Sequence, residues 1–268
     1  MILRFAGGKA KLLPLLRPYI NGLVDGQDSF HDVFVGGGAL LLDVARRHPE
    51  LTLHANDGDA ALIAFWRIVS GRSVESLCER VMATRPTVKL FEHMLASKPC
   101  KPEDIAFRFY FLNRTSFSGL WRGGPIGGLN QRSRWKVDVE WRAEKSVNDI
   151  REANRLLRGR LTLSCLSGTD YVAGNLKKPL FVDPPYFGRG DRLYDQKMTF
   201  ADHLELSHLL RHARSWVLTL DDSPAVRQLY SWACIHVIPT RYHIDSARPR
   251  RASAQELVIT PVDSGDVI

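Results

Sequence analysis

The tetrapeptide Asp183-Pro184-Pro185-Tyr186 contains the residue types needed to activate an exocyclic amine. The Asp183 carboxylate and the Pro184 carbonyl can each accept one N–H of such an amine, which frees the nitrogen lone pair to attack a methyl group. Proline fixes φ and thereby holds the direction of a carbonyl, and the Tyr186 ring can stack on a base. This pattern favours methyl transfer to a base over a rigid turn without chemistry. A base paired in a duplex must flip out to reach such a loop.

Three glycines and a later acid are typical of a nucleoside site. Gly36, Gly37 and Gly38 follow an apolar run and precede an amphipathic stretch, where glycine lets a ligand approach the backbone. Asp57 follows the next apolar run and lies about 20 residues after Gly36. At that spacing a carboxylate can accept hydrogen bonds from ribose hydroxyls. Together they favour a nucleoside cofactor over a tight turn and a helix cap. They do not separate NAD from S-adenosylmethionine, whereas 183–186 favours the latter.

Short apolar runs alternate with amphipathic stretches of helical length, which is typical of α/β proteins with a mainly parallel sheet. We predict strands at 31–35, 51–55, 161–166, 180–182, 216–220, 235–239 and 256–260. We predict helices at 9–20, 38–48, 58–70, 74–84, 103–113, 146–158, 202–214 and 224–231. His203, His208 and His212 fall on one predicted helix, and we interpret them as surface residues rather than metal ligands.

The alternation of strands and helices fails between about 71 and 150. This block is instead helical at first and then rich in glycine around Pro125. The length of 268 residues allows two domains. We therefore expect 71–150 to form an inserted, mainly helical domain that reads the target, and 1–70 with 151–268 to form the catalytic domain.

Composition limits the class of partner and the compartment. The net charge of +8 favours an anionic partner. The four cysteines include no C-x-x-C pair, which indicates free thiols rather than disulfides or a zinc site. No secretory signal and no apolar run of membrane-spanning length are apparent, so we expect a cytoplasmic protein.

The glycine-rich block has the charge expected of a DNA-binding surface. Between 105 and 137 there is no Asp or Glu, and the cations are Arg108, Arg114, Arg122, Arg132, Arg134 and Lys136. Arginine binds phosphates and reads guanine edges. Phe117 or Trp121 could fill the gap that a flipped base leaves. The aromatic residues within 107–111 have helical spacing and are expected in the core.

These segments resemble the Dam-type DNA adenine N6-methyltransferases, in the motif order called the alpha group. The resemblance extends from Phe5 to about Thr260. It rests on F-A-G-G-K at 5–9, F-V-G-G-G at 34–38, N-D at 56–57, N-R-T-S-F-S-G-L-W-R at 113–122 and D-P-P-Y at 183–186. The segments follow one another in the family's order and at its distances, which is more specific than any single motif.

The resemblance implies a Rossmann-like methyltransferase fold with a mixed sheet, S-adenosylmethionine as cofactor and no metal. It implies methyl transfer to N6 of an adenine in double-stranded DNA, which yields N6-methyladenine and S-adenosylhomocysteine. It assigns catalysis to Asp183, Pro184, Pro185 and Tyr186. It assigns cofactor binding to Phe5, Ala6, Gly7, Gly8, Lys9, Asp32, Phe34, Gly36, Gly37, Gly38, Asp57, Asp170 and Asp183. The residues expected to bind DNA are Arg114, Phe117, Ser118, Leu120, Trp121, Arg122, Arg132 and Arg134.

Two positions depart from the family pattern. Ser118 stands where Asn is usual, in the loop that touches bases, so the resemblance does not specify the target sequence. Val33 follows Asp32 where the family usually has proline after the acid. Adenine in RNA and N4 of cytosine are alternative acceptors, although Asp183 favours adenine. A non-catalytic DNA-binding descendant is a further alternative. The resemblance also suggests a bacterial or phage-encoded protein and a cognate restriction endonuclease as a partner.

Overall fold

The computed structural model describes residues 2–5, 8–119, 123–186, 198–239 and 255–262. The strands are β1 Ser29–Asp32, β2 Thr52–Asn56, β3 Leu161–Ser164, β4 Pro179–Val182, β5 Ser215–Asp221, β6 Cys234–Pro239 and β7 Gln255–Thr260. They form a seven-stranded sheet in the order β3-β2-β1-β4-β5-β7-β6. The pairs β2–β3, β1–β4 and β4–β5 are parallel, whereas β7 is antiparallel to β5 and β6. The predicted mixed α/β sheet is confirmed.

Helices precede and follow most strands along the chain. They are α1 Leu13–Val24, α2 Ala39–Arg47, α3 Ala60–Ser70, α4 Val74–Ala83, α5 Val88–Ala96, α6 Pro102–Thr115, α7 Ala143–Leu157, α8 Gly168–Ala173, α9 Phe200–His212 and α10 Pro224–Leu229. Two 3-10 turns are η1 Lys9–Lys11 and η2 Phe117–Gly119. All eight predicted helices are present, and the first begins as η1. Two further helices, α5 and α8, were not predicted from the sequence pattern.

The first predicted strand, 31–35, is wrong at both ends, because β1 runs from Ser29 to Asp32. The residues that follow still bond to neighbouring segments without forming a regular ladder. Val33 donates to the Phe181 carbonyl at 2.9 Å, and Val35 donates to the Asn56 carbonyl at 2.9 Å. The backbone turns at 33–34, directly after β1, before it reaches the glycines.

Backbone contacts divide the chain into two compact units. Unit 1 comprises Met1–Ala10 and Val35–Cys165, and unit 2 comprises Lys11–Phe34 and Leu166–Ile268. The block 71–150 lies within unit 1, and its described regular elements are α4, α5, α6, η2 and the start of α7. Among its described residues, Ser116 and Pro125 form an isolated β-bridge. The domain boundaries that the sequence indicates stay a prediction.

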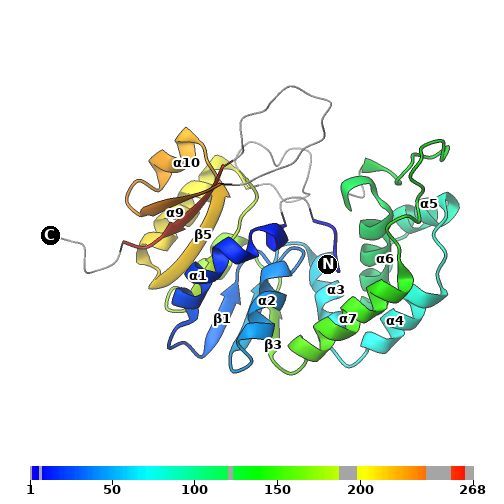
Figure 1. Ribbon diagram of the computed structural model, residues 1–268, viewed down its shortest axis with the longest axis horizontal. Coiled ribbons are helices and arrows are strands. Elements are labelled where there is room, and N and C mark those ends of the chain that lie inside the picture. The colour runs from blue at the N-terminus through cyan, green and yellow to red at the C-terminus, as the bar shows by residue number, and fades with distance from the viewer. Residues whose placement is uncertain (1, 6–7, 120–122, 187–197, 240–254, 263–268) are drawn as a thin grey trace. The chain divides into compact units, whose positions relative to one another are not determined.

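The helical part of unit 1 has an aromatic core (Figure 1, cyan to green). α3 packs on α6, where Phe65 and Tyr110 stack with ring centroids 5.6 Å apart. Trp141 packs on Phe107, Tyr110 and Phe111. All five of these side chains are buried, so the prediction that 107–111 contributes to the core is confirmed.

Unit 2 has a core of aliphatic and aromatic side chains between its strands and helices. On β5, Leu218 and Leu220 point to the same face, because side chains alternate along a strand, and they pack with Leu206 and Leu210 of α9. α1 contacts β4 and β5 (Figure 1). The end of β4, which Asp183 follows, and the β5 residue Thr219 are thus held within a packed layer.

The four cysteines are free thiols, as predicted. Within the described part of the chain, no helix is long and apolar enough to cross a membrane.

Candidate active site

In unit 1, residues 36–38 form a tight turn, here called the glycine turn, that leads from Val35 into α2. The Gly38 N–H donates to the Val35 carbonyl at 2.8 Å. The Trp66 indole of α3 supports the turn, because its Nε1 donates to the Gly36 carbonyl at 3.0 Å. Gly38 has φ +67°, and a Cβ there would lie 2.3 Å from the Trp66 ring. Sequence patterns did not single out Trp66, although it holds both ends of the turn.

The Asp57 carboxylate lies against the glycine turn. Its Oδ2 accepts from the Gly36 N–H at 3.1 Å, and its Oδ1 accepts from the Asp59 N–H at 3.1 Å. The cap of α3 is a different residue, Asp59, which accepts from the N–H groups of Ala61 and Leu62. Since Asp59 caps the helix, the capping explanation for Asp57 does not hold. Asp57 is available as the acid of a nucleoside site.

The electrostatic state of Asp57 reflects its surroundings. Burial raises its pKa to about 6, and the hydrogen bonds from Asp59 and Gly36 oppose that rise. At neutral pH the group is therefore ionised, but protonation begins only slightly below. A carboxylate that already accepts two backbone N–H groups has further lone pairs for two hydroxyl donors.

The N-terminal segment packs beside the glycine turn. A Cβ on Gly37 would lie 3.2 Å from the Cβ of Phe5, so the Phe5 side chain lies against the turn. Gly8 donates to the Phe5 carbonyl at 3.2 Å, and Lys9 is buried. Unit 1 thus brings Phe5, the glycine turn and Asp57 together, and their binding of a cofactor stays a prediction. Ala6 and Gly7, also predicted to bind cofactor, lie outside the described residues.

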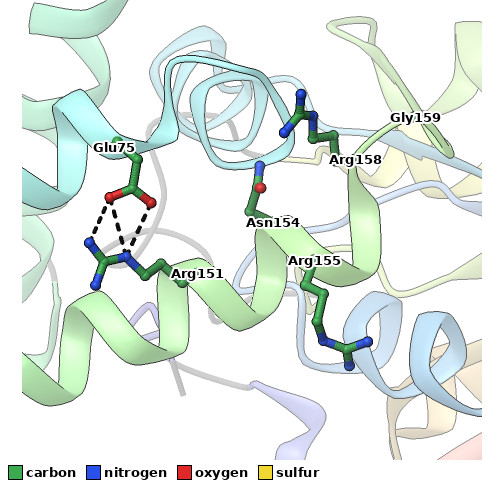
Figure 2. Close-up of a pocket in the computed structure, with 6 residues that line it drawn as sticks. All are labelled: Glu75, Arg151, Asn154, Arg155, Arg158 and Gly159. Carbon is green, nitrogen blue, oxygen red and sulfur yellow. Dashed lines mark hydrogen bonds and ion pairs between the residues drawn. The ribbon is translucent and has the colours of Figure 1, made fainter.

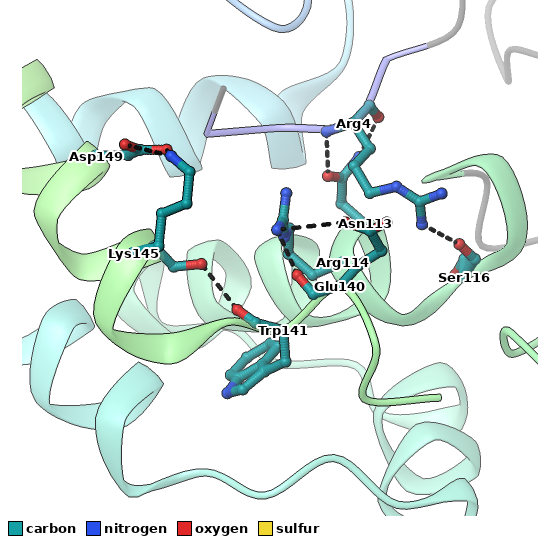
Figure 3. Close-up of polar contacts among 9 residues, drawn as sticks. Arg4, Asn113, Arg114, Ser116, Glu140, Trp141, Lys145 and Asp149 are labelled. Atoms are coloured by element: carbon teal, nitrogen blue, oxygen red, sulfur yellow. Dashed lines mark hydrogen bonds and ion pairs between the residues drawn. The ribbon is translucent and has the colours of Figure 1, made fainter. Parts of the chain in front are cut away.

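The same segment is bonded to the predicted DNA-binding loop (Figure 3). The buried Asn113 amide accepts from the Arg4 N–H at 2.8 Å and donates to the Arg4 carbonyl at 2.8 Å. It also donates to the Gly119 carbonyl at 3.3 Å. The Arg4 guanidinium donates to the Ser116 carbonyl at 2.9 Å. Asn113 and Arg4 therefore join the segments that carry two of the predicted motifs.

The residues predicted to bind DNA differ in exposure. Arg114 is buried, and its guanidinium donates to the Glu140 carbonyl (Figure 3). Phe117 is 64% exposed, and Ser118 is also exposed. Arg114 is thus placed to support this loop from inside, while Phe117 faces solvent. Leu120, Trp121 and Arg122 lie outside the described residues.

A second loop, 126–137, presents cations on its surface. The Gln131 amide organises it: Nε2 donates to the carbonyls of Ile126 and Gly128 at 2.8 and 2.6 Å, and Oε1 accepts from Val137 at 2.9 Å. Its exposed residues include Arg132, Arg134, Trp135 and Lys136. The Arg134 guanidinium lies 5.1 Å from the centre of the Trp135 ring. The sequence pattern gives no sign of this role for Gln131, because its partners lie in an irregular loop.

In unit 2, residues 183–186 follow β4 directly and are here called the proline loop. The Asp183 Oδ1 accepts from the Thr219 hydroxyl of β5 at 2.7 Å. Thr219 is fully buried, so this bond is shielded from water. The geometry fixes the orientation of the carboxylate that the sequence identifies as catalytic.

Two further residues hold the rest of the proline loop. The Tyr186 hydroxyl donates to Oε1 of Glu256, a buried residue of β7, at 2.7 Å. His203 of α9 donates to the backbone carbonyl of Pro185, and burial lowers its pKa. The interpretation of His203 as a surface residue is therefore wrong, whereas His208 and His212 are exposed. None of these supports was predicted, because they come from elements distant in sequence.

The other predicted cofactor residues of unit 2 lie near the start of α8 or in β1. A Cβ on Gly168 would lie 2.1 Å from the Phe34 ring, so the ring packs against this helix start. Asp170 is exposed, and its carboxylate accepts from the Ser167 hydroxyl at 2.7 Å. Asp32 is buried in β1. Asp170 thus takes part in the cap of α8, and its cofactor role stays a prediction.

A pocket on α4 and α7 of unit 1 holds none of the predicted residues (Figure 2). It is lined by Glu75, Arg151, Asn154, Arg155, Arg158 and Gly159. Arg151 pairs with Glu75 at 2.6 Å, and both side chains are exposed. Exposed pairs of this kind contribute little to stability, because water and salt screen the two charges. The pocket is therefore a charged surface feature and does not contribute to the site described above.

Two comparisons with known proteins each find a similarity. The family model for D12 class N6 adenine-specific DNA methyltransferases matches residues 5–244. The chain is also similar to the type II methyltransferase M.CviBI of Paramecium bursaria Chlorella virus NC1A. The two are 23% identical over 238 residues, which is 85% of each chain. The matched family range includes the glycine turn, Asp57, the two loops and the proline loop.

The contact of Trp66 with the glycine turn predicts that Gly38→Ala destabilises the protein more than its backbone angle alone requires. Gly26→Ala is the matched control, since Gly26 has φ +66° and nothing within 4 Å of a Cβ. A left-handed angle costs an alanine about 1–2 kcal/mol. We expect Gly38→Ala to lower the free energy of unfolding by about 1–3 kcal/mol more than the control, because the added Cβ overpacks against the Trp66 ring. Urea unfolding measures both variants, and equal losses would contradict the role of Trp66.

Proposed function

The chain belongs to the family of D12 class N6 adenine-specific DNA methyltransferases, and from that premise we propose that it methylates adenine at one specific DNA sequence, after flipping the base out of the duplex. It is an N6-adenine DNA methyltransferase, and its substrate is DNA. The observation that carries the finer proposal is the Asp183 carboxylate at the end of β4, oriented by the buried Thr219 hydroxyl.

Membership of a methyltransferase family implies S-adenosylmethionine as the cofactor. The residues of unit 1 fit its nucleoside part: the Asp57 carboxylate would accept hydrogen bonds from the ribose hydroxyls, and Phe5 would pack on the cofactor beside the glycine turn. When bound, the cofactor supplies a methyl group on a positively charged sulfur, which is an electrophilic carbon. No residue of this proposal needs a metal ion.

The proline loop would activate the target amine. The lone pair of adenine N6 is delocalised into the ring, so the amine is a poor nucleophile. Asp183 and the Pro184 carbonyl would accept its two N–H bonds and draw the nitrogen towards tetrahedral geometry, which localises the lone pair. As the new N–C bond forms, the bond from the methyl carbon to the cofactor sulfur would break, and S-adenosylhomocysteine would leave as a neutral thioether. N6 then carries the positive charge and must lose one proton, which Asp183 would receive. Tyr186, held by Glu256, presents its ring for stacking on the base.

The DNA would contact the two loops of unit 1. Phe117 is exposed and apolar, which suits a side chain that fills the gap left by the flipped base. Arg132 and Arg134 are exposed on a loop without acids and would bind phosphates or base edges. Arg114, being buried, is proposed to support the first loop rather than to contact DNA. The likeness to a type II methyltransferase favours a cognate restriction endonuclease as a partner in the cell.

The first prediction from this proposal concerns the product. Incubation with labelled S-adenosylmethionine and unmethylated genomic DNA is expected to give N6-methyladenine, identified after digestion to nucleosides. Asp183→Ala should lower kcat at least about 100-fold, because the amine loses a charge-assisted acceptor. Asp222→Ala is the control, since it removes an acid of the same unit that pairs with Arg227 at 2.6 Å. N4-methylcytosine as product, or product only with RNA, would contradict adenine in DNA as the methyl acceptor. A fully active Asp183→Ala variant would contradict the proposed mechanism.

The second prediction concerns the support of Asp183. Thr219→Val keeps the buried shape and removes the hydroxyl that donates to Asp183, so kcat is expected to fall about tenfold, which is about 1.4 kcal/mol. Because Thr219 acts through Asp183, kcat is expected to fall more than the affinity for S-adenosylhomocysteine. Thr219→Ser retains the hydroxyl and should retain most of the activity. Equal kcat for the Val and Ser variants in steady-state assays would remove Thr219 from the mechanism.

The third prediction follows from the raised pKa of Asp57, about 6. The ribose hydroxyls need the ionised carboxylate, so the affinity for S-adenosylhomocysteine should fall as the pH drops through 6. It should be about tenfold weaker at pH 5 than at pH 7.5. The stability of the ligand-free protein changes with pH in the opposite direction. Because the folded state raises the pKa of Asp57, the group stabilises the fold below its ordinary pKa near 4, and that stabilisation is lost as the pH rises through 6. Calorimetry from pH 5 to 7.5 measures the affinity, and Asp57→Asn should bind weakly with little pH dependence.

A further inference from the structure

The Asn113 side chain joins the N-terminal segment to the loop that is proposed to contact DNA. The Asn113 amide accepts from the Arg4 N–H and donates to the Arg4 carbonyl, both at 2.8 Å, which is how a neighbouring strand would pair with that residue. The same amide nitrogen donates to the Gly119 carbonyl at 3.3 Å. Asn113 is 5% exposed, so water does not replace these bonds easily.

Contacts extend from this pair to both proposed binding regions. On one side, Arg4 is followed directly by Phe5, whose side chain lies against the glycine turn. On the other side, Gly119 approaches Arg4 so closely that a Cβ would lie 2.4 Å from the Arg4 carbonyl oxygen. The Arg4 guanidinium adds a bond to the Ser116 carbonyl, next to the exposed Phe117 (Figure 3). Packed and bonded groups therefore connect Phe5 with the backbone of 116–119.

We propose that Asn113 is a positioning residue that couples the two ligands, so that cofactor bound beside Phe5 and the glycine turn orders the loop that contacts DNA. The proposal rests on the proposed function, because it takes the cofactor and DNA sites from there. Linkage requires that DNA raise the affinity for the cofactor by the same factor as the cofactor raises the affinity for DNA. Couplings of this kind are typically about 5–150-fold.

The test is the ratio of two affinities, which a loss of stability alone would not change. The affinity for S-adenosylhomocysteine is measured by calorimetry on the full chain, with and without saturating sheared, unmethylated genomic DNA. DNA is expected to tighten binding to the wild type about tenfold. In Asn113→Ala the ratio should fall to near one, because both bonds to Arg4 are lost.

Asn154→Ala is the matched control. The Asn154 amide of α7 bonds the carbonyls of Val69 and Gly71 at 2.7 and 2.8 Å within the same unit, so its loss should cost similar stability. It contacts neither proposed binding region, and its ratio should equal that of the wild type. Equal loss of the ratio in Asn154→Ala and Asn113→Ala would show a general loss of order and overturn the proposal.

A second pair keeps the test decisive if Asn113→Ala does not fold. Gly119→Ala places a Cβ against the Arg4 carbonyl, whereas Gly124→Ala, at the same φ of +75°, meets nothing within 4 Å. Gly119→Ala should lose the coupling and Gly124→Ala should keep it. A wild type without coupling, or variants that retain it, would overturn the role of Asn113. Absence of methylated DNA would instead contradict the proposed function, which the product assay reports separately.

Discussion

The hydrogen bonds from the Gly36 and Asp59 N–H groups to the Asp57 carboxylate hold the acid on which the nucleoside site of unit 1 depends. A half-buried carboxylate is unfavourable unless donors compensate for lost water. Gly36 can donate only while the glycine turn is in place, and the turn rests on the Trp66 indole. The position of one ionisable group therefore depends on an aromatic side chain of α3. The raised pKa of Asp57 shows that the compensation is incomplete, which leaves the carboxylate ready to accept further donors.

Unit 2 meets the same requirement with side chains instead of backbone. The two prolines of the proline loop have no N–H group, so the loop cannot bond its own acceptors through them. The Asp183 carboxylate, the Pro185 carbonyl and the Tyr186 hydroxyl therefore need partners from other elements. Thr219 of β5 binds Asp183, His203 of α9 binds Pro185, and Glu256 of β7 binds Tyr186. Because β5 and β7 are paired in antiparallel register, Thr219 and Glu256 lie on the same face of the sheet. The loop is thus supported at both ends by strands and in its middle by a helix.

The difference between local patterns and contacts from distant elements explains which features could be predicted from the sequence. Apolar periodicity is local, so the seven strands and eight of the helices were predicted within a few residues of their ends. The motifs were predicted because each combines an unusual composition with a place after a strand. α5 was missed because Phe91 is its one buried residue, which leaves little apolar pattern to detect. Trp66, Thr219 and Glu256 were missed for another reason: their roles depend on strand register and helix packing, which bring together residues 30 to 70 positions apart.

The backbone at Ser118 bears on the departure from the family pattern. Ser118 has φ +55° and ψ +17°, which places it in the left-handed region. Asn adopts this conformation more readily than Ser, because its short amide bonds locally to the backbone. The Asn that is usual at this position in the family therefore suits the left-handed backbone of the turn, independently of any contact with a base. In this chain Gly119 follows with φ +75°, and Asn113 bonds its carbonyl from inside. The loop is held in a strained conformation by contacts to Arg4, so its shape depends on the segment that the cofactor is proposed to bind.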